Sequence, residues 1–267
     1  MGACMTLSLS DFSGFNIDLY LLVFMRMSGL FIFNPIFGRQ NIPVTLRAAL
    51  GFLCALVVAP TLSGMSVQIG GVVQLIVMSL GELFIGLAIG VVVNLMINAV
   101  QFAGELIDMQ MGLTMAQMYD ANSGINMPLL GSFFNALMIL CFFASNAHIS
   151  LITFVSDSFR LVAPGNVFPT QQSMHFIFSL GKDYFELGLR MAIPVVAIEI
   201  ICQISIGMLM KAVPSINVFS IGTHITALVG IIIILFTMTP LVNMCGQIVT
   251  YMLEKVVEVI KLIGAGT

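Results

Sequence analysis

The run at residues 72–102 reads VVQLIVMSLGELFIGLAIGVVVNLMINAVQF, and Glu82 is its one charged side chain. A helix needs about 20 apolar residues to cross the hydrocarbon core of a bilayer, because each residue adds about 1.5 Å to its length. This run exceeds that length. It therefore predicts a long helix embedded in a membrane.

Further apolar runs lie on both sides of it, at residues 17–37, 46–62, 129–155, 185–210 and 221–251. Of the 267 residues, 59% are hydrophobic and 8% are charged, whereas about a quarter of a soluble domain is charged. We therefore predict an all-α membrane protein built from apolar helical hairpins. Proline or a charged side chain interrupts several runs, as Pro194 and Arg190 do at 185–210, so we expect these helices to pack against protein.

The composition also limits the classes of function. A net charge of −3 supplies no basic face for nucleic acid, so that class is excluded. The cysteines are widely spaced and form no CxxC pair, so we expect no metal site. The sequence has no GxxxxGK[ST] loop, GxSxG elbow or HExxH motif. We therefore predict no catalytic residue, no cofactor and no enzymatic activity.

Four charged side chains inside the apolar runs are predicted to be buried: Arg26, Glu82, Arg190 and Glu199. An ion at the centre of a membrane span costs ~2.5 to 3.5 kcal/mol unless it is paired or hydrated. We expect Arg26 to pair with Glu82, the alternative being that each side chain reaches water separately. Arg190 lies four residues after Glu186 and can pair with it on one helix face, whereas Glu199 needs a different partner.

Two glycines of the central run, Gly86 and Gly90, lie four residues apart. This spacing leaves room for the backbone of a second helix, so it predicts a close helix contact. In a chain with 24 glycines the same spacing also arises by chance.

Residues 105–128, ELIDMQMGLTMAQMYDANSGINMP, differ from the apolar runs because they are rich in methionine and carry no Lys or Arg. Methionine is unbranched and deformable, so a cluster of it can seal around varied shapes, although it also fills gaps in ordinary cores. Gly112 and the Asn-Ser-Gly sequence at 122–124 favour irregular backbone, which a membrane protein tolerates inside protein or beside a cavity. We predict a deformable seal whose candidate residues are Met109, Met111, Met115 and Met118.

Residues 249–263 predict an amphipathic helix. Its apolar positions, among them Val249, Met252 and Val256, fall on one stripe, and Glu254 and Glu258 lie off it. Because the polar face is not basic, we favour packing against a partner protein over binding to anionic lipid.

A set of charged, polar, glycine, proline and aromatic residues follows a characteristic order and spacing over nearly the whole chain. In sequence order they are Arg26 with Gly29 and Pro35; Pro43 with Arg47; Gly81 and Glu82 with Gly86 and Gly90; Gly104, Asp108, Gln110 and Gly112; Ser158 and Phe159 with Pro164; and Pro214, Asn217, Val218, Phe219 and Gly222. This pattern resembles the FliR proteins of the bacterial flagellar export apparatus and their injectisome counterparts.

The resemblance implies a closed, helical export gate that this chain forms with FliP and FliQ subunits, together with FlhB. Such a gate lies in the bacterial inner membrane at the flagellar basal body, and exported flagellar proteins are its substrates. The resemblance also implies that residues 1–184 are FliP-like and that residues 105–128 are a plug. Residues 185–267 would be a FliQ-like helical hairpin followed by the amphipathic helix.

A different hypothesis is a secondary transporter or proton channel in which Arg26, Glu82 and Glu199 relay an ion, because charges inside a membrane often mark pathways. The sequence lacks the symmetric repeat of such proteins. A membrane enzyme would need a nucleophile with a base near it, and no such pair is found in the sequence. Purification distinguishes the first two hypotheses, because a transporter is stable alone or as a homo-oligomer and a gate subunit needs different partners.

Overall fold

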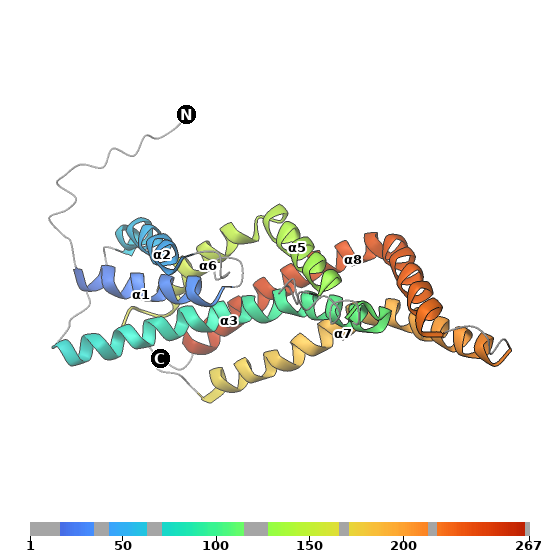
Figure 1. Cartoon of the computed structure of the whole chain (residues 1–267). Helices are drawn as coiled ribbons and strands as arrows, with labels where there is room; N and C mark the ends of the chain where they lie inside the picture. Colours follow the sequence, from blue (N-terminus) through green and yellow to red (C-terminus); the bar gives the residue numbers. More distant parts are fainter. Residues whose placement is uncertain are drawn as a thin grey trace. The chain divides into compact units, whose positions relative to one another are not determined.

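The computed structural model describes residues 17–34, 43–62, 71–114, 128–165, 171–212 and 218–264. Its elements are all helical (Figure 1): α1 (Ile17–Phe33), α2 (Val44–Val58), the 3-10 turn η2 (Ala59–Leu62), α3 (Val72–Met111), α5 (Leu129–Ala144), α6 (Ala147–Leu161), α7 (Gln171–Ala212) and α8 (Val218–Gly264). Four helices in the described ranges are long and apolar enough to cross a membrane, or five spans if the bent α5–α6 pair counts as one. The predicted all-α membrane fold is confirmed.

Three helices are longer than the apolar runs that predicted them. Helix α3 continues to Met111, α7 begins at Gln171, and α8 includes the whole amphipathic tail, which is therefore no separate helix. A helix satisfies its own backbone hydrogen bonds and can extend beyond its apolar part, so hydrophobicity alone gives poor helix ends. Pro194 and Pro240 lie inside α7 and α8 without ending them. An interior proline commonly bends a helix, and α8 changes direction along its length in Figure 1.

The run at 129–155, predicted as one segment, is divided by a corner between α5 and α6. The two helices meet at an angle of 65°. The backbone N–H of Ser145 donates to the Cys141 carbonyl at 3.0 Å, and Asn146 has a φ of 56°. Asparagine tolerates this left-handed conformation better than most residues do. Two polar residues therefore end one helix and redirect the chain into the next.

The chain divides into two compact units. The first comprises Met1–Val91, Ile152–His175 and Val257–Thr267, and the second comprises Val92–Leu151 and Phe176–Val256. The division expected between residues 184 and 185 separates a FliP-like part from a FliQ-like part. It does not predict which residues form a compact unit, so the two compact units do not test it. It remains a prediction.

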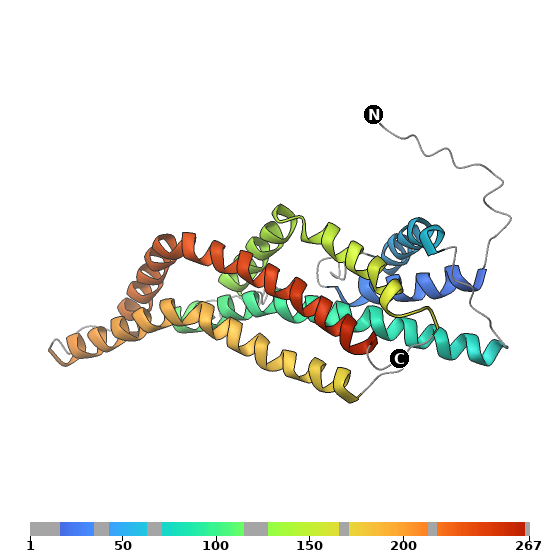
Figure 2. The same cartoon turned by 180° about the vertical axis from the view of Figure 1, so that it is seen from behind.

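In the first unit, α1 and α3 touch through their backbones. A Cβ atom at Gly86 would lie 2.0 Å from the carbonyl oxygen of Arg26, and one at Gly29 would lie 2.7 Å from that of Leu83. The close contact expected at Gly86 is therefore present, and Gly90 is buried one turn further on. Figures 1 and 2 show α1 beside the first half of α3.

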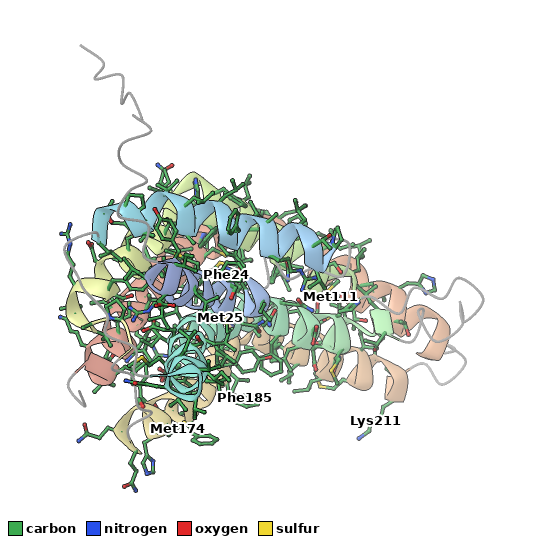
Figure 3. The ribbon with its side chains drawn as sticks, turned by 90° about the vertical axis from the view of Figure 1, so that its left-hand side faces the viewer. Phe24, Met25, Met111, Met174, Phe185 and Lys211 are labelled. Atoms are coloured by element: carbon green, nitrogen blue, oxygen red, sulfur yellow. The ribbon has the colours of Figure 1, made fainter. Side chains whose placement is uncertain are left out.

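Helix α2 packs against the other side of α1. Phe24 of α1, labelled in Figure 3, meets Phe52 of α2 edge to face, with ring centroids 6.3 Å apart. A Cβ at Gly51 of α2 would lie 3.3 Å from the Cα of Ser28. Glycines thus set the spacing of the helices on both sides of α1.

In the second unit, the second half of α3 packs against α5 and α7. A Cβ at Gly104 would lie 2.6 Å from the carbonyl oxygen of Leu130, and one at Gly188 would lie 3.0 Å from that of Ala99. The ring of Phe102 lies 5.6 Å from that of Phe185 on α7. Helices α7 and α8 run in opposite directions (Figure 2).

Candidate functional site

Arg26 is the centre of a buried polar cluster in the first unit. Its Nε donates to Oε2 of Glu82 at 2.6 Å, and both side chains are 0% exposed. Its Nη1 donates to Oγ of Ser158 at 2.8 Å, and its Nη2 donates to the carbonyl oxygen of Val162 at 3.3 Å. A buried ion pair is stable only when its remaining donors and acceptors are satisfied, and these bonds meet that condition.

The same cluster joins three helices and a turn. The second oxygen of Glu82, Oε1, accepts the backbone N–H of Gly165 at 2.9 Å, and the Arg26 guanidinium lies 3.9 Å from the centroid of the Phe159 ring. The expected pair between Arg26 and Glu82 is present, and the alternative in which each reaches water is wrong. The contribution of Ser158 and Phe159 on α6 was not predicted, because no spacing rule relates residues more than 130 positions apart.

The end of α3 is held by α7 and α8 in the second unit. A Cβ at Gly230 would lie 2.6 Å from Sδ and Cε of Met111 and 2.6 Å from Oε1 of Glu199, so both side chains pack against Gly230. The Thr226 hydroxyl lies 3.4 Å from the Met111 carbonyl oxygen, and Nε2 of Gln203 donates to the backbone oxygen of Gln110 at 3.0 Å. The helix therefore ends in a fixed position.

The candidate seal residues differ in their environments. Met111 is fully buried, whereas Met109 is 65% exposed. Met115 and Met118 lie outside the described residues. Composition could not separate Met109 from Met111, because which face of α3 is covered depends on the packing of α7 and α8.

Glu199 is 0% exposed, as expected from the sequence. Among the described residues, none donates a hydrogen bond to either of its carboxyl oxygens. Its surroundings include Gly230, whose missing side chain leaves room for the carboxyl group.

Asp108 on α3 is a further buried acid, and its contacts were not predicted from the sequence. Its Oδ2 accepts the backbone N–H groups of Leu130 at 2.9 Å and Gly131 at 3.2 Å. These groups belong to the first turn of α5, whose own cap residue, Pro128, makes no side-chain hydrogen bond to the helix. An aspartate usually caps the helix that it immediately precedes, so a cap from another helix is not recognisable in sequence.

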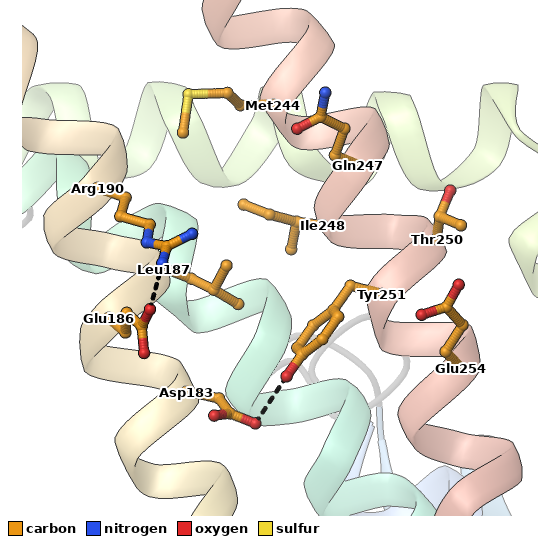
Figure 4. Close-up of a pocket in the computed structure, with 10 residues that line it drawn as sticks. All are labelled: Asp183, Glu186, Leu187, Arg190, Met244, Gln247, Ile248, Thr250, Tyr251 and Glu254. Carbon is orange, nitrogen blue, oxygen red and sulfur yellow. Dashed lines mark hydrogen bonds and ion pairs between the residues drawn. The ribbon is translucent and has the colours of Figure 1, made fainter.

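A groove with several charged side chains in its lining lies between α7 and α8 (Figure 4). Its volume is about 500 Å³, and its lining includes Asp183, Glu186, Arg190, Tyr251 and Glu254. The Tyr251 hydroxyl donates to Oδ2 of Asp183 at 2.9 Å, and Arg190 pairs with Glu186 one turn before it. The groove therefore concentrates charge in a chain that has little of it.

The prediction that Arg190 is buried is wrong, because its side chain is 67% exposed. Arg190 borders the open groove, where its guanidinium remains accessible while its apolar stem lies along α7. The expected pairing with Glu186 is present.

Comparison with known proteins identifies the family. The chain is 29% identical over 249 residues to the flagellar biosynthetic protein FliR of Bacillus subtilis, a match that covers 92% of this chain and 95% of that protein. It is 31% identical over 209 residues to FliR of Pectobacterium carotovorum, covering 78% of this chain and 79% of that protein. The family model for bacterial export proteins, family 1, matches residues 17–252. The chain belongs to the FliR family of bacterial export proteins.

The resemblance expected from the residue pattern is thus confirmed. The family match includes the Arg26 cluster, the end of α3 and the residues named above for the α7–α8 groove except Glu254, which lies just beyond it. The relatives are named as flagellar biosynthetic proteins, and their names indicate no catalytic activity.

Proposed function

We propose that this FliR-family chain is a subunit of a flagellar protein-export gate, in which it joins FliP and FliQ subunits around a closed pathway. The family match over residues 17–252 carries the proposal. The gate would lie in the bacterial inner membrane at the flagellar basal body, next to FlhB. Its substrates would be exported flagellar proteins, and residues 1–184 and 185–267 would be its FliP-like and FliQ-like parts.

The surface of α7 and α8 supports assembly with other subunits. These helices expose large apolar side chains, such as Phe178 at 81% and Phe236 at 85%, which require lipid or protein neighbours. The groove between the same helices carries Asp183, Glu186 and Glu254, which are unfavourable in contact with hydrocarbon. Protein neighbours that cover both kinds of surface satisfy the two requirements together.

Residues 105–128 would seal the pathway. The end of α3 supports this role, because Met111 is anchored by α7 and α8 while Met109, two residues earlier, presents a flexible side chain at the surface. An anchored helix end beside an exposed thioether suits a seal that is fixed at its base and deformable at its surface.

No contact described in the structure favours the transporter hypothesis. Arg26 and Glu82 are occupied by each other and by fixed partners in the first unit. A relay needs groups that exchange partners, whereas this cluster joins helices. We therefore propose the gate alone.

The experiment shortens the seal. Residues 115–127 are replaced by about six Gly and Ser residues in the chain co-expressed with FliP and FliQ. A linker of that length can reach, because the Asp108 bond to Leu130 holds α3 and α5 together and each linker residue spans up to about 3.5 Å. A variant with the same residues in shuffled order is the matched control.

The measurement is passage of small ions or a dye across membranes of cells that carry the complex, beside a check that the subunits co-purify. We expect the shortened variant to assemble and leak, while the shuffled variant leaks less because it keeps the length and the apolar content. A shortened variant that assembles and stays as tight as the parent would show that the methionines are ordinary packing. Loss of assembly would show that the segment supports the fold instead of sealing a pathway.

A further inference from the structure

Two cysteines on different helices meet inside the second unit. Cys141 lies on α5 and Cys245 lies on α8, and their thiol groups share a hydrogen bond. Both helix segments belong to the compact unit that comprises Val92–Leu151 and Phe176–Val256. Figures 1 and 2 show α8 crossing α5. Both thiols are free, so the contact between them is not covalent.

Each cysteine lies on the side of its helix that packs inward. On α5, Phe134 and Met138 are fully buried, and Cys141 follows Met138 by three residues. On α8, Leu241 and Cys245 are both buried and lie four residues apart. Residues three or four apart share one side of a helix. The packing of the two helices therefore brings the thiols together.

A pair of thiols in contact is typical of either a metal site or a disulfide. A zinc site uses three or four protein ligands. Among the residues that the structure describes, no group of three His, Cys, Asp or Glu side chains could hold a metal ion. The pair therefore favours a disulfide.

Formation of that bond requires little movement of the two sulfur atoms. A disulfide places its sulfurs about 2 Å apart, so the pair has to close only the gap between hydrogen-bond contact and bond length. The bond would close a loop of about 100 residues, and a loop of that size restricts the unfolded chain strongly. A disulfide here should therefore stabilise the folded chain.

The environments of the two thiols set the order of the reaction. Cys141 is partly exposed, whereas Cys245 is buried, so a small disulfide RSSR reaches Cys141 first. The Cys141 sulfur loses its proton and attacks RSSR, which forms a mixed disulfide and releases one RSH. The Cys245 sulfur then loses its proton and attacks the Cys141 sulfur, which releases the second RSH. The two protein thiols are oxidised, RSSR is reduced, and both protons end on RSH.

We infer that Cys141 and Cys245 are a redox-sensitive pair, which a small disulfide converts into a reversible covalent brace between α5 and α8. The brace would join the part of the chain before residue 184 to the part after it. This inference goes beyond the proposed gate and does not depend on it.

The first measurement is peptide mass mapping, without reductant, of membranes that carry the full chain together with FliP and FliQ. In this chain the other three cysteines, Cys4, Cys54 and Cys202, are replaced by alanine, and the oxidant is dipyridyl disulfide. We expect Cys141 joined to Cys245, and dithiothreitol should separate them. A pyridyl group kept on Cys141 beside a free Cys245 would overturn the inference. Two thiols that stay free, or a bond between two copies of the chain, would also overturn it.

A matched control keeps Cys202 and Cys245 and carries alanine at the other three cysteines. Cys202 is also partly exposed, but it lies near Glu199 and no described contact joins it to Cys245. It should therefore keep the pyridyl group and form no bond. A bond between Cys202 and Cys245 of equal yield would show that proximity on α5 is not what selects the pair.

The second measurement is thermal unfolding of the complex purified with FliP and FliQ, before and after oxidation. The midpoint should rise when the bond between Cys141 and Cys245 forms, because the bond restricts the unfolded chain, and it should return after reduction. C245A treated in the same way should show no rise. A bond that forms without raising the midpoint would overturn the role as a brace.

Discussion

Replacing Arg26 by methionine perturbs the buried cluster of the first unit most directly. The change leaves the Glu82 carboxylate without its cation and removes the bonds to Ser158 and Val162. Breaking a buried pair in this way costs about 3 to 5 kcal/mol of unfolding free energy, because the remaining charge stays out of water. Glu82→Gln should cost a similar amount. The double variant removes both charges, so its loss of unfolding free energy should be about 0.5 to 3 kcal/mol smaller than the sum of the single losses.

The assay is urea unfolding of the parent, the two single variants and the double variant, each in the complex purified with FliP and FliQ in mild detergent, followed by circular dichroism. The exposed pair formed by Glu186 and Arg190 is the matched control, since it has the same two residue types at the surface. Breaking it should change the unfolding free energy by about 0.5 kcal/mol or less. Strictly additive losses at Arg26 and Glu82 would refute the coupling. Equal losses at the buried and exposed pairs would refute the role of burial.

Three further predictions follow from single positions and are measured by thermal unfolding of the complex purified with FliP and FliQ. Met111→Ala should lower the free energy of unfolding by about 2 to 5 kcal/mol, because the side chain is fully buried. Met109→Ala should leave it nearly unchanged, because Met109 is exposed. Equal effects of the two changes would contradict the different environments of the two residues. Gly86→Ala should lower the midpoint of thermal unfolding, because its Cβ would lie 2.0 Å from a backbone oxygen of α1. Gly246 has open space around it, so Gly246→Ala should leave the midpoint unchanged or raise it. Glu199→Met should raise stability by about 1 to 3 kcal/mol, because it removes a buried carboxyl group to which no described residue donates; a loss of stability would reveal a partner.

The sequence predicted helices well where a strong apolar run defined them. The run at 72–102 gave the centre of α3, and its glycines gave the approach of α1 at Gly86. Helix ends were predicted poorly, since α7 begins at Gln171, in a polar stretch that its internal hydrogen bonds nevertheless support. The corner at Ser145 and Asn146 was missed because two polar residues within a long apolar run barely change its hydropathy.

The candidate site was predictable only in part. A charge inside an apolar run needs a partner, and that argument was enough to pair Arg26 with Glu82. Arg190 was predicted to be buried for the same reason, but its side chain is exposed. Burial depends on which side of α7 another element covers, and the sequence of α7 does not show this. The Asp108 cap on α5 could not be predicted, since its acceptor and donors lie on different helices and meet only in the folded chain.

The mass of the particle purified after co-expression with FliP and FliQ decides whether this chain is a subunit of a three-component gate. We predict a single species whose mass, measured by native mass spectrometry, requires all three kinds of subunit. We also predict that this chain aggregates when it is expressed alone, because exposed apolar side chains such as Phe178 and Phe236 need protein or lipid neighbours. A monodisperse monomer or homo-oligomer of this chain, with FliP and FliQ eluting separately, would contradict the account.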